Sequence, residues 1–162
     1  MCVCSIVPRA FAPIARAEPR PPPTGEKQKR RKRFTPHTRH LLELARRRQQ
    51  AAVLSLRYIG VRYVWGGNGP RGFDCSGLVQ YVMSRVGIKV PHYTYSQLNL
   101  PVPVPAGARL RAGDAVFFHG GSHMGLVLDQ THYIASPHTG AYVRIRELPP
   151  RRDLYAVRRF IT

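Results

Sequence analysis

The chain has 162 residues, of which 43% are apolar, enough for one domain with a buried core but too few for several. It carries 26 lysines and arginines against 8 aspartates and glutamates, a formal net charge of +18, so its surface attracts polyanions. No apolar run approaches the roughly 20 residues that a helical membrane span needs, which excludes a protein built on such spans.

Residues 1–36 form a basic, proline-rich segment. They contain Pro21-Pro22-Pro23 and the cationic run Lys27–Arg33, and they show almost no apolar periodicity. Burial therefore cannot offset the entropy of ordering, and we predict a disordered tail. The cationic run is typical of a solvated linker, or of an arm that binds nucleic acid or another polyanion.

The first residues also contain part of an export signal. Ala15-Arg16-Ala17 has the small-x-small pattern of a signal-peptidase site, but Pro8, Arg9 and Pro13 interrupt the stretch before it. An apolar core of the usual kind is missing, so the leader is atypical or defective. A misassigned start codon or another export route would explain the same defect.

Two amphipathic segments predict helices. The first runs from Thr38 to Gly60 as one long helix or two, with apolar residues at helical spacing: Leu41, Leu42, Leu44, Ala45, Ala52, Val53, Leu56 and Ile59. The second begins after Asp74, which is placed to cap it, and stops at Gly87; its apolar stripe is Leu78, Val79, Val82, Met83 and Val86.

Short β-type runs separated by turn residues follow Pro91. They cover Ala115–Phe118, His123–Asp129, Tyr133–Ala135, Tyr142–Glu147 and Leu154–Ile161. Helices followed by a meander of strands predict an α+β domain over residues 37–162, in which the helices cover one face of an antiparallel sheet of about five strands.

Cys75 stands at the start of the second predicted helix. Two of the three cysteines lie in the first four residues, so the domain has no pair for a disulfide, and Cys75 is a lone thiol. Unpaired N–H groups and the positive end of the helix dipole would lower its pKa and stabilise an oxyanion on an attacked carbonyl. A buried, inert cysteine is the alternative.

Four segments of the chain resemble signatures of the NlpC/P60 family. Tyr63–Gly67 and Gly72–Val79 match the segment that carries the nucleophile, and Leu110–Phe118 and Ser122–Leu128 match the next two signatures in the same order. The resemblance extends from about Leu54 to Phe160. It implies a reduced papain-like fold and a cysteine endopeptidase that cleaves peptidoglycan stem peptides, often at the D-γ-glutamyl–diaminopimelyl bond.

By this resemblance Cys75 is the nucleophile and His123 the general base, with no cofactor required. The family usually places a third polar residue on the next strand, where an ungapped alignment puts Ala135. Alanine cannot orient an imidazole. His138 and Ser136 are nearby substitutes, and a water molecule or a backbone carbonyl could also hold the tautomer of His123.

Three further residues match family positions that line the cleft. Tyr63, Asp74 and Ser76 would contact the intermediate or the polar ends of the substrate. Each also has a simpler role: Tyr63 as a core aromatic, Asp74 as a helix cap and Ser76 as a first-turn residue.

The histidines do not predict a metal site. His119 and His123 are four residues apart, but Gly120-Gly121 between them indicates a turn, and no glutamate stands where a zinc peptidase needs its base. His37, His40, His92 and His132 have the sequence context of ordinary surface or loop residues.

Three functions from different classes remain at this stage. The first is a secreted or envelope-associated peptidase that acts on stem peptides, with the basic tail holding anionic wall polymers. The second is a non-catalytic module that binds peptidoglycan, which the alanine at position 135 motivates. The third, a nucleic-acid-binding protein, is motivated by charge alone, since the sequence holds no recognised nucleic-acid motif.

Overall fold

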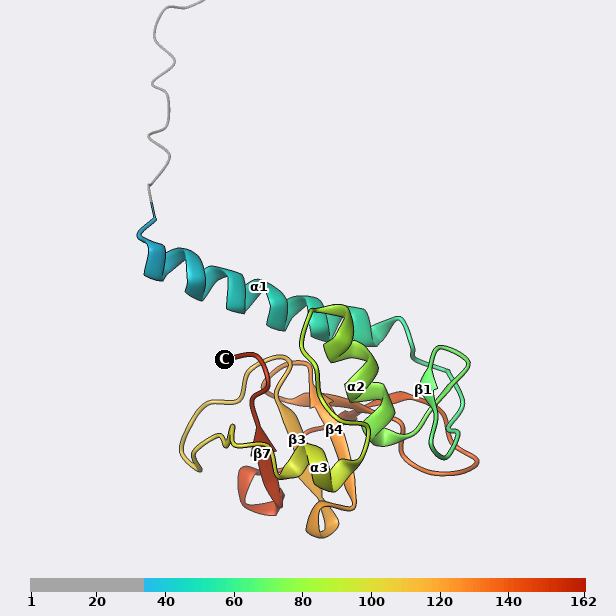
Figure 1. Cartoon of the computed structure of the whole chain (residues 1–162). Helices are drawn as coiled ribbons and strands as arrows, with labels where there is room; N and C mark the ends of the chain where they lie inside the picture. Colours follow the sequence, from blue (N-terminus) through green and yellow to red (C-terminus); the bar gives the residue numbers. More distant parts are fainter. Residues whose placement is uncertain (1–33) are drawn as a thin grey trace, which may run out of the picture. The chain divides into compact units, whose positions relative to one another are not determined.

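The computed structural model describes residues 34–162, and the predictions for residues 1–33 lie outside this part of the chain. Figure 1 shows a long helix that leads into a smaller helical layer packed against a sheet. The helices are α1 (Pro36–Leu56), α2 (Cys75–Arg85) and α3 (Thr94–Leu98). None of these helices is long and apolar enough to cross a membrane.

Helix α1 is one continuous helix, so of the two alternatives predicted for this segment, one long helix or two, the first is confirmed. Thr35 caps it by accepting a hydrogen bond from the N–H of Thr38. Its second half packs on the core, and Arg48 donates to the carbonyl of Ile161 at 2.8 and 3.1 Å. Leu41 in its first half is 49% exposed. The helix is therefore held to the domain mainly by its C-terminal half.

Helix α2 has the predicted cap and stop. The carboxylate of Asp74 accepts from the N–H of Gly77 at 2.6 Å, and the chain leaves the helix at Gly87 with φ of +80°. The predicted apolar stripe faces inward, with Leu78, Val82 and Met83 fully buried. The local signals of capping and periodicity are thus sufficient to predict this helix.

The predicted antiparallel sheet has the strand order β6-β5-β4-β3-β7. Its strands are shorter than predicted at several ends and comprise β3 (Ala115–Phe118), β4 (His123–Val127), β5 (His132–Ala135), β6 (Arg144–Glu147) and β7 (Ala156–Arg158). The sequence did not predict α3 or the small hairpin of β1 (Asn68–Gly69) and β2 (Gly72–Phe73), since both are too short to show a period.

Strands β3, β4 and β5 are largely buried on both faces of the sheet, whereas the edge strand β6 is exposed along its length. One face packs against α2, where Met124, Leu126 and Phe117 meet the helix. The other face, with Val116, Phe118, Val127, Tyr133, Ala135 and Val157, is covered by loop residues such as Leu110 and Leu154. The predicted α+β class is therefore confirmed. Helix α2 packs against β4, so Cys75 and His123, the first residues of these two elements, lie on packed elements.

Candidate active site

A cavity of about 700 Å³ opens at the start of α2. Its lining brings together most of the residues predicted from the sequence: Tyr63, Asp74, Cys75, Ser76, His123 and His138. Ser136 and Ala135 do not line it. The aromatic rings of Trp65, Tyr93 and Tyr95 form part of its wall, and Trp65 is 86% exposed.

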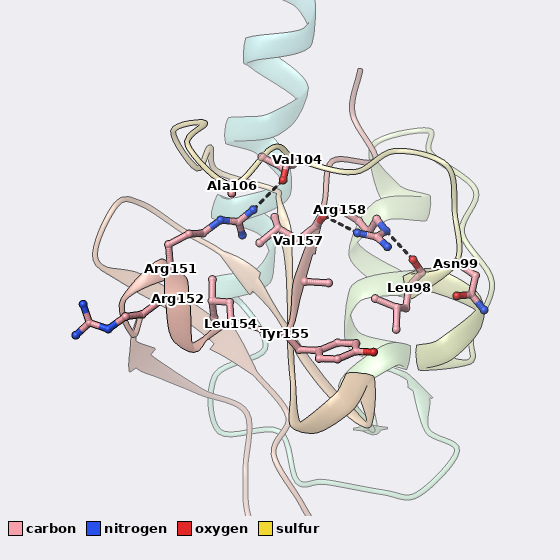
Figure 2. A pocket seen from close by; sticks show the side chains of 11 residues that line it. Leu98, Asn99, Val104, Ala106, Arg151, Arg152, Leu154, Tyr155, Val157 and Arg158 are labelled. Carbon is pink, nitrogen blue, oxygen red and sulfur yellow. Dashed lines mark hydrogen bonds between the residues drawn. The ribbon is translucent and has the colours of Figure 1, made fainter.

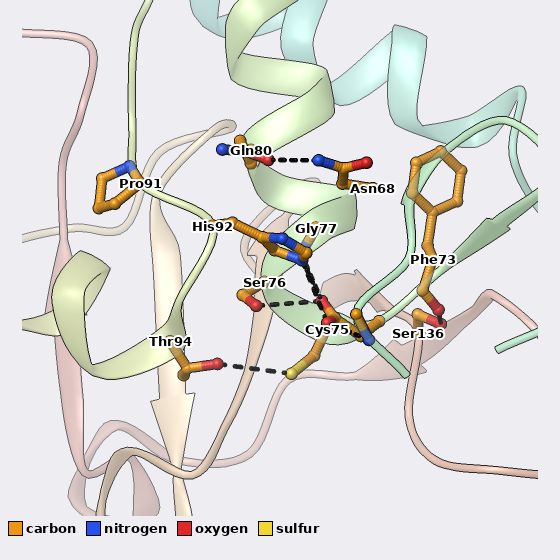
Figure 3. Close-up of polar contacts among 12 residues, drawn as sticks. Asn68, Phe73, Cys75, Ser76, Gly77, Gln80, Pro91, His92, Thr94 and Ser136 are labelled. Atoms are coloured by element: carbon orange, nitrogen blue, oxygen red, sulfur yellow. Dashed lines mark hydrogen bonds and ion pairs between the residues drawn. The ribbon is translucent and has the colours of Figure 1, made fainter. Parts of the chain in front are cut away.

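Cys75 is the first residue of α2, and 9% of its surface is exposed. Its Sγ lies 3.7 Å from the Oγ1 of Thr94 on α3. Figure 3 shows the two side chains pointing toward each other. Burial raises the pKa of the Cys75 thiol; the bond to Thr94 lowers it, and the charge of Asp74 raises it again. The N–H of Ser76 at the helix start does lower the thiol pKa, but desolvation of the thiolate outweighs it, so the prediction of a lowered pKa is wrong.

His123 opens β4 and faces the same cavity. Burial lowers the pKa of its imidazole to about 4, and the neighbouring charges of His119, Arg146 and His138 act in the same direction. The ring stacks on Phe118, with centroids 5.8 Å apart. At neutral pH the site therefore holds a neutral imidazole and a protonated thiol.

The third position of the constellation is occupied by a buried methyl group. Val127 on β4 pairs with Tyr133 on β5, and alternation along each strand places His123 and Ala135 on this same face. Within residues 34–162 no side chain is found in hydrogen-bond contact with the His123 ring. Ala135 thus shares the face of His123 but has no group that could bond its ring.

The two predicted substitutes for Ala135 have other partners. The buried hydroxyl of Ser136 donates to the carbonyl of Phe73 at 2.6 Å, which ties β5 to β2 (Figure 3). The Nδ1 of His138 donates to the carbonyl of Thr139 at 3.0 Å. His138 lines the cavity with His123. Ser136 would have to give up its hydrogen bond to Phe73 in order to orient the imidazole of His123.

Asp74 organises the polar side of the cavity. Besides capping α2, its carboxylate accepts from the Oγ of Ser76 at 3.0 Å and from the N–H of Gly66 at 3.0 Å. The Nε2 of His92 lies 3.1 Å from the same carboxylate. The cap role weighed for Asp74 is therefore present, and Ser76 directs its hydroxyl at Asp74.

His92 and Gln97 do not line the cavity, but each bonds a residue that does, and the sequence analysis missed both. Gln97 is fully buried, and its amide donates to the carbonyls of Ser76 and Pro91 at 3.0 and 2.7 Å. The bond to Ser76 fixes α3 against the first turn of α2 and so positions Thr94 beside Cys75, and the bond to Pro91 ties α3 to the loop before it. The contacts of His92 with Asp74 and of Gln97 with Ser76 join residues 18 and 21 apart in sequence, and no local pattern marks them.

A second cavity, of about 750 Å³, lies along β7 and is lined by arginines (Figure 2). Arg151 donates to the carbonyl of Val104 at 2.8 Å, and Arg158 donates to that of Leu98 at 2.6 Å. These guanidinium groups stabilise loop backbone. The lining holds no nucleophile and no base, so the smaller cavity at Cys75 is the candidate active site.

The comparisons with known proteins agree with this geometry. The NlpC/P60 family model matches residues 60–156. The peptidoglycan endopeptidase RipA of Mycobacterium tuberculosis is 39% identical over 102 residues, which cover 54% of this chain and 21% of RipA. The probable endopeptidase YafL of Escherichia coli is 40% identical over 102 residues, which cover 56% of this chain and 39% of YafL.

A solved structure shows the same fold. The peptidoglycan hydrolase RipB of Mycobacterium tuberculosis superimposes with a TM-score of 0.66 at 26% identity, covering 75% of this chain and 68% of that one. The chain matches well under half of the length of RipA and YafL, so these relatives contain large regions that it does not match.

Proposed function

The chain belongs to the NlpC/P60 family, and from this premise we propose that it is a cysteine endopeptidase that hydrolyses an amide bond in peptidoglycan stem peptides. The observation that carries the proposal is the meeting of Cys75 and His123 in one cavity at the start of a helix. The D-γ-glutamyl–diaminopimelyl bond is the proposed target.

The chemistry follows from the resting protonation states. His123 is neutral, so it takes the thiol proton as the sulfur of Cys75 attacks the amide carbonyl carbon. Proton transfer occurs with the attack because burial keeps the thiol protonated at rest. The imidazolium then gives this proton to the leaving amine. Water, deprotonated by His123, hydrolyses the thioester and releases the acid.

The start of α2 supplies donors for the oxyanion. Asp74 occupies the N–H of Gly77 with its side chain and that of Leu78 with its carbonyl. The N–H of Ser76 is directed at the thiol of Cys75, and within residues 34–162 the N–H of Cys75 has no hydrogen-bond partner. We propose that both donate to the oxyanion as the sulfur is consumed in the attack. We assign to Tyr63, Asp74 and Ser76 contacts with the polar ends of the substrate, since all three line the cavity.

The relatives support the substrate class. RipA is a peptidoglycan endopeptidase and RipB a peptidoglycan hydrolase. A protein with this substrate would act in the cell envelope or outside the cell, and anionic wall polymers are proposed partners of the basic tail.

The test compares the protein with Cys75→Ala on defined muropeptides, with the products identified by mass spectrometry. We expect the wild type to release a new amine and the variant to release none, while both keep the same circular dichroism spectrum. Equal turnover by the variant would sink the peptidase proposal.

A second candidate function is a module that binds stem peptide without cutting it. It is favoured by one observation, the methyl group of Ala135 where His123 would need a hydrogen-bond partner. Calorimetric binding of a muropeptide by the wild type, with no product after long incubation, would select this function over the first.

A further inference from the structure

Two side chains of opposite charge line the cavity, and they differ in whether they have hydrogen-bond partners. The carboxylate of Asp74 is occupied by donors from Gly66, Ser76, Gly77 and His92. Arg146 also lines the cavity, yet within residues 34–162 its guanidinium has no ion pair and no hydrogen bond to another residue. The cavity therefore offers a free cation while its anion is already satisfied.

Arg146 lies on the same side of the cavity as the base. It belongs to the edge strand β6 and pairs with Tyr133 on β5, so the two side chains share a face of the sheet. The ring of Tyr133 covers Gly125, two residues after His123, and contacts Phe118, on which His123 stacks. The charge of Arg146 also contributes to the lowered pKa of His123, after burial and His119.

The direction of proton transfer indicates which part of the substrate lies beside His123. His123 hands its proton to the leaving amine, so the half of the substrate that leaves must pass along His123. Arg146 stands on that side. A guanidinium with five donors in a planar fork matches a carboxylate, which can accept two of them in parallel.

We propose that Arg146 binds a carboxylate of the residue that leaves with the amine, and that it thereby selects acidic over amidated substrates. This inference rests on the proposed peptidase function. It names the chemical class of the leaving residue, an amino acid with a free carboxylate next to the scissile bond, and it gives the unpaired cation a ligand.

The experiment uses two synthetic stem peptides that differ in one group, a carboxylate or a carboxamide on the leaving residue. We expect the wild type to cleave the carboxylate peptide with a kcat/KM about tenfold higher, as a charge-assisted hydrogen bond would give. In Arg146→Gln this ratio should fall to about one, and in Arg146→Lys it should fall in part.

Arg144→Gln is the matched control, because Arg144 is an exposed arginine of the same strand that does not line the cavity. It should keep the tenfold ratio. Arg146→Gln also raises the pKa of His123, but this change acts on both peptides alike and cancels in the ratio. An equal loss on both peptides, or no preference in the wild type, would overturn the inference.

Binding separates this inference from the proposed function. Calorimetry with Cys75→Ala measures the affinity for the two peptides without turnover. A preference that disappears in Cys75→Ala/Arg146→Gln supports the carboxylate site, even if the wild type proves to cleave nothing. Equal affinity of Cys75→Ala for both peptides overturns the site, even if the wild type is an active peptidase.

Discussion

The thiol of Cys75 illustrates how two effects on one atom compete. A helix start and a nearby hydroxyl favour the thiolate, whereas burial and the charge of Asp74 oppose it, and the opposing effects are larger. The sequence shows the helix start but not the depth at which the sulfur lies. The predicted place of Cys75 at the start of a helix is confirmed, and the predicted lowering of its pKa is wrong.

We expect alkylation of Cys75 by iodoacetamide to accelerate only at a pH above about 8.5, the value of a free thiol. The rate would be measured at this site by mass spectrometry across pH. Thr94→Val keeps the size of the side chain but removes the hydroxyl that lowers the thiol pKa, so its profile should shift further upward. A rate that is already at its plateau at neutral pH would contradict the structure.

The pKa of the His123 imidazole predicts where kcat/KM falls on the acid side of its pH profile. Its pKa of about 4 means that the base stays neutral down to that pH, so kcat/KM should fall only as the pH drops through about 4, not near 6.5. His119→Gln removes a neighbouring positive charge, which should raise the pKa of His123 and move the limb upward. A wild-type limb near pH 6.5 would show that the base is solvated.

Position 135 is the place to restore an orienting group. Ala135 is fully buried beside Tyr133, so Ala135→Asn adds a hydrogen-bonding amide on the face of His123 at some cost in packing. We expect kcat/KM to rise about tenfold, close to 1.4 kcal/mol of transition-state stabilisation, while the melting temperature falls. Ala135→His and Ala135→Glu supply larger groups for the same test.

His138→Ala tests the alternative in the wild-type background. A large loss of activity there, with no gain from any substitution at position 135, would show that His138 already orients the base. No effect from either change would mean that the pair works without a side-chain orienter.

At the scale of elements, α3 is the shortest α-helix of residues 34–162, and two of its residues, Thr94 and Tyr95, line the cavity. It supplies Thr94 to the thiol, and Gln97 fastens it to the first turn of α2. The pattern of apolar residues predicts α1, α2 and the five strands because each has a period and local end signals. Helix α3 has five residues and is stabilised by contacts with distant residues, which no local pattern encodes.

Gln97→Ala should destabilise the protein by about 1–3 kcal/mol, because the buried carbonyl of Ser76 and the partly buried carbonyl of Pro91 lose their donor. Urea denaturation would measure the loss. Gln80→Ala is the matched control: the amide of Gln80 also donates to a carbonyl, that of Val90 at 3.3 Å, but at a partly exposed site, so it should cost less. An equal cost for both variants would refute the anchoring role of Gln97.

At the scale of the whole molecule, charge dominates. The chain has a formal net charge of +18, and half of its basic residues lie in residues 1–50. We propose that residues 1–33 add screened attraction to an anionic wall. Their deletion should leave the turnover of small muropeptides unchanged but weaken binding to whole sacculi, and salt should mimic the deletion. Equal binding at low ionic strength would show that the segment is only a linker or a leader.

The buried thiol also has a consequence for oxidation. Peroxide attacks thiolates, and a raised pKa leaves Cys75 with a smaller thiolate fraction at neutral pH than a free cysteine has. Residues 34–162 contain no second cysteine that could resolve a sulfenic acid as a disulfide. The proposed nucleophile, which would ionise only as it attacks, is therefore protected from oxidation at rest, and the described part of the chain has no second thiol that could repair it.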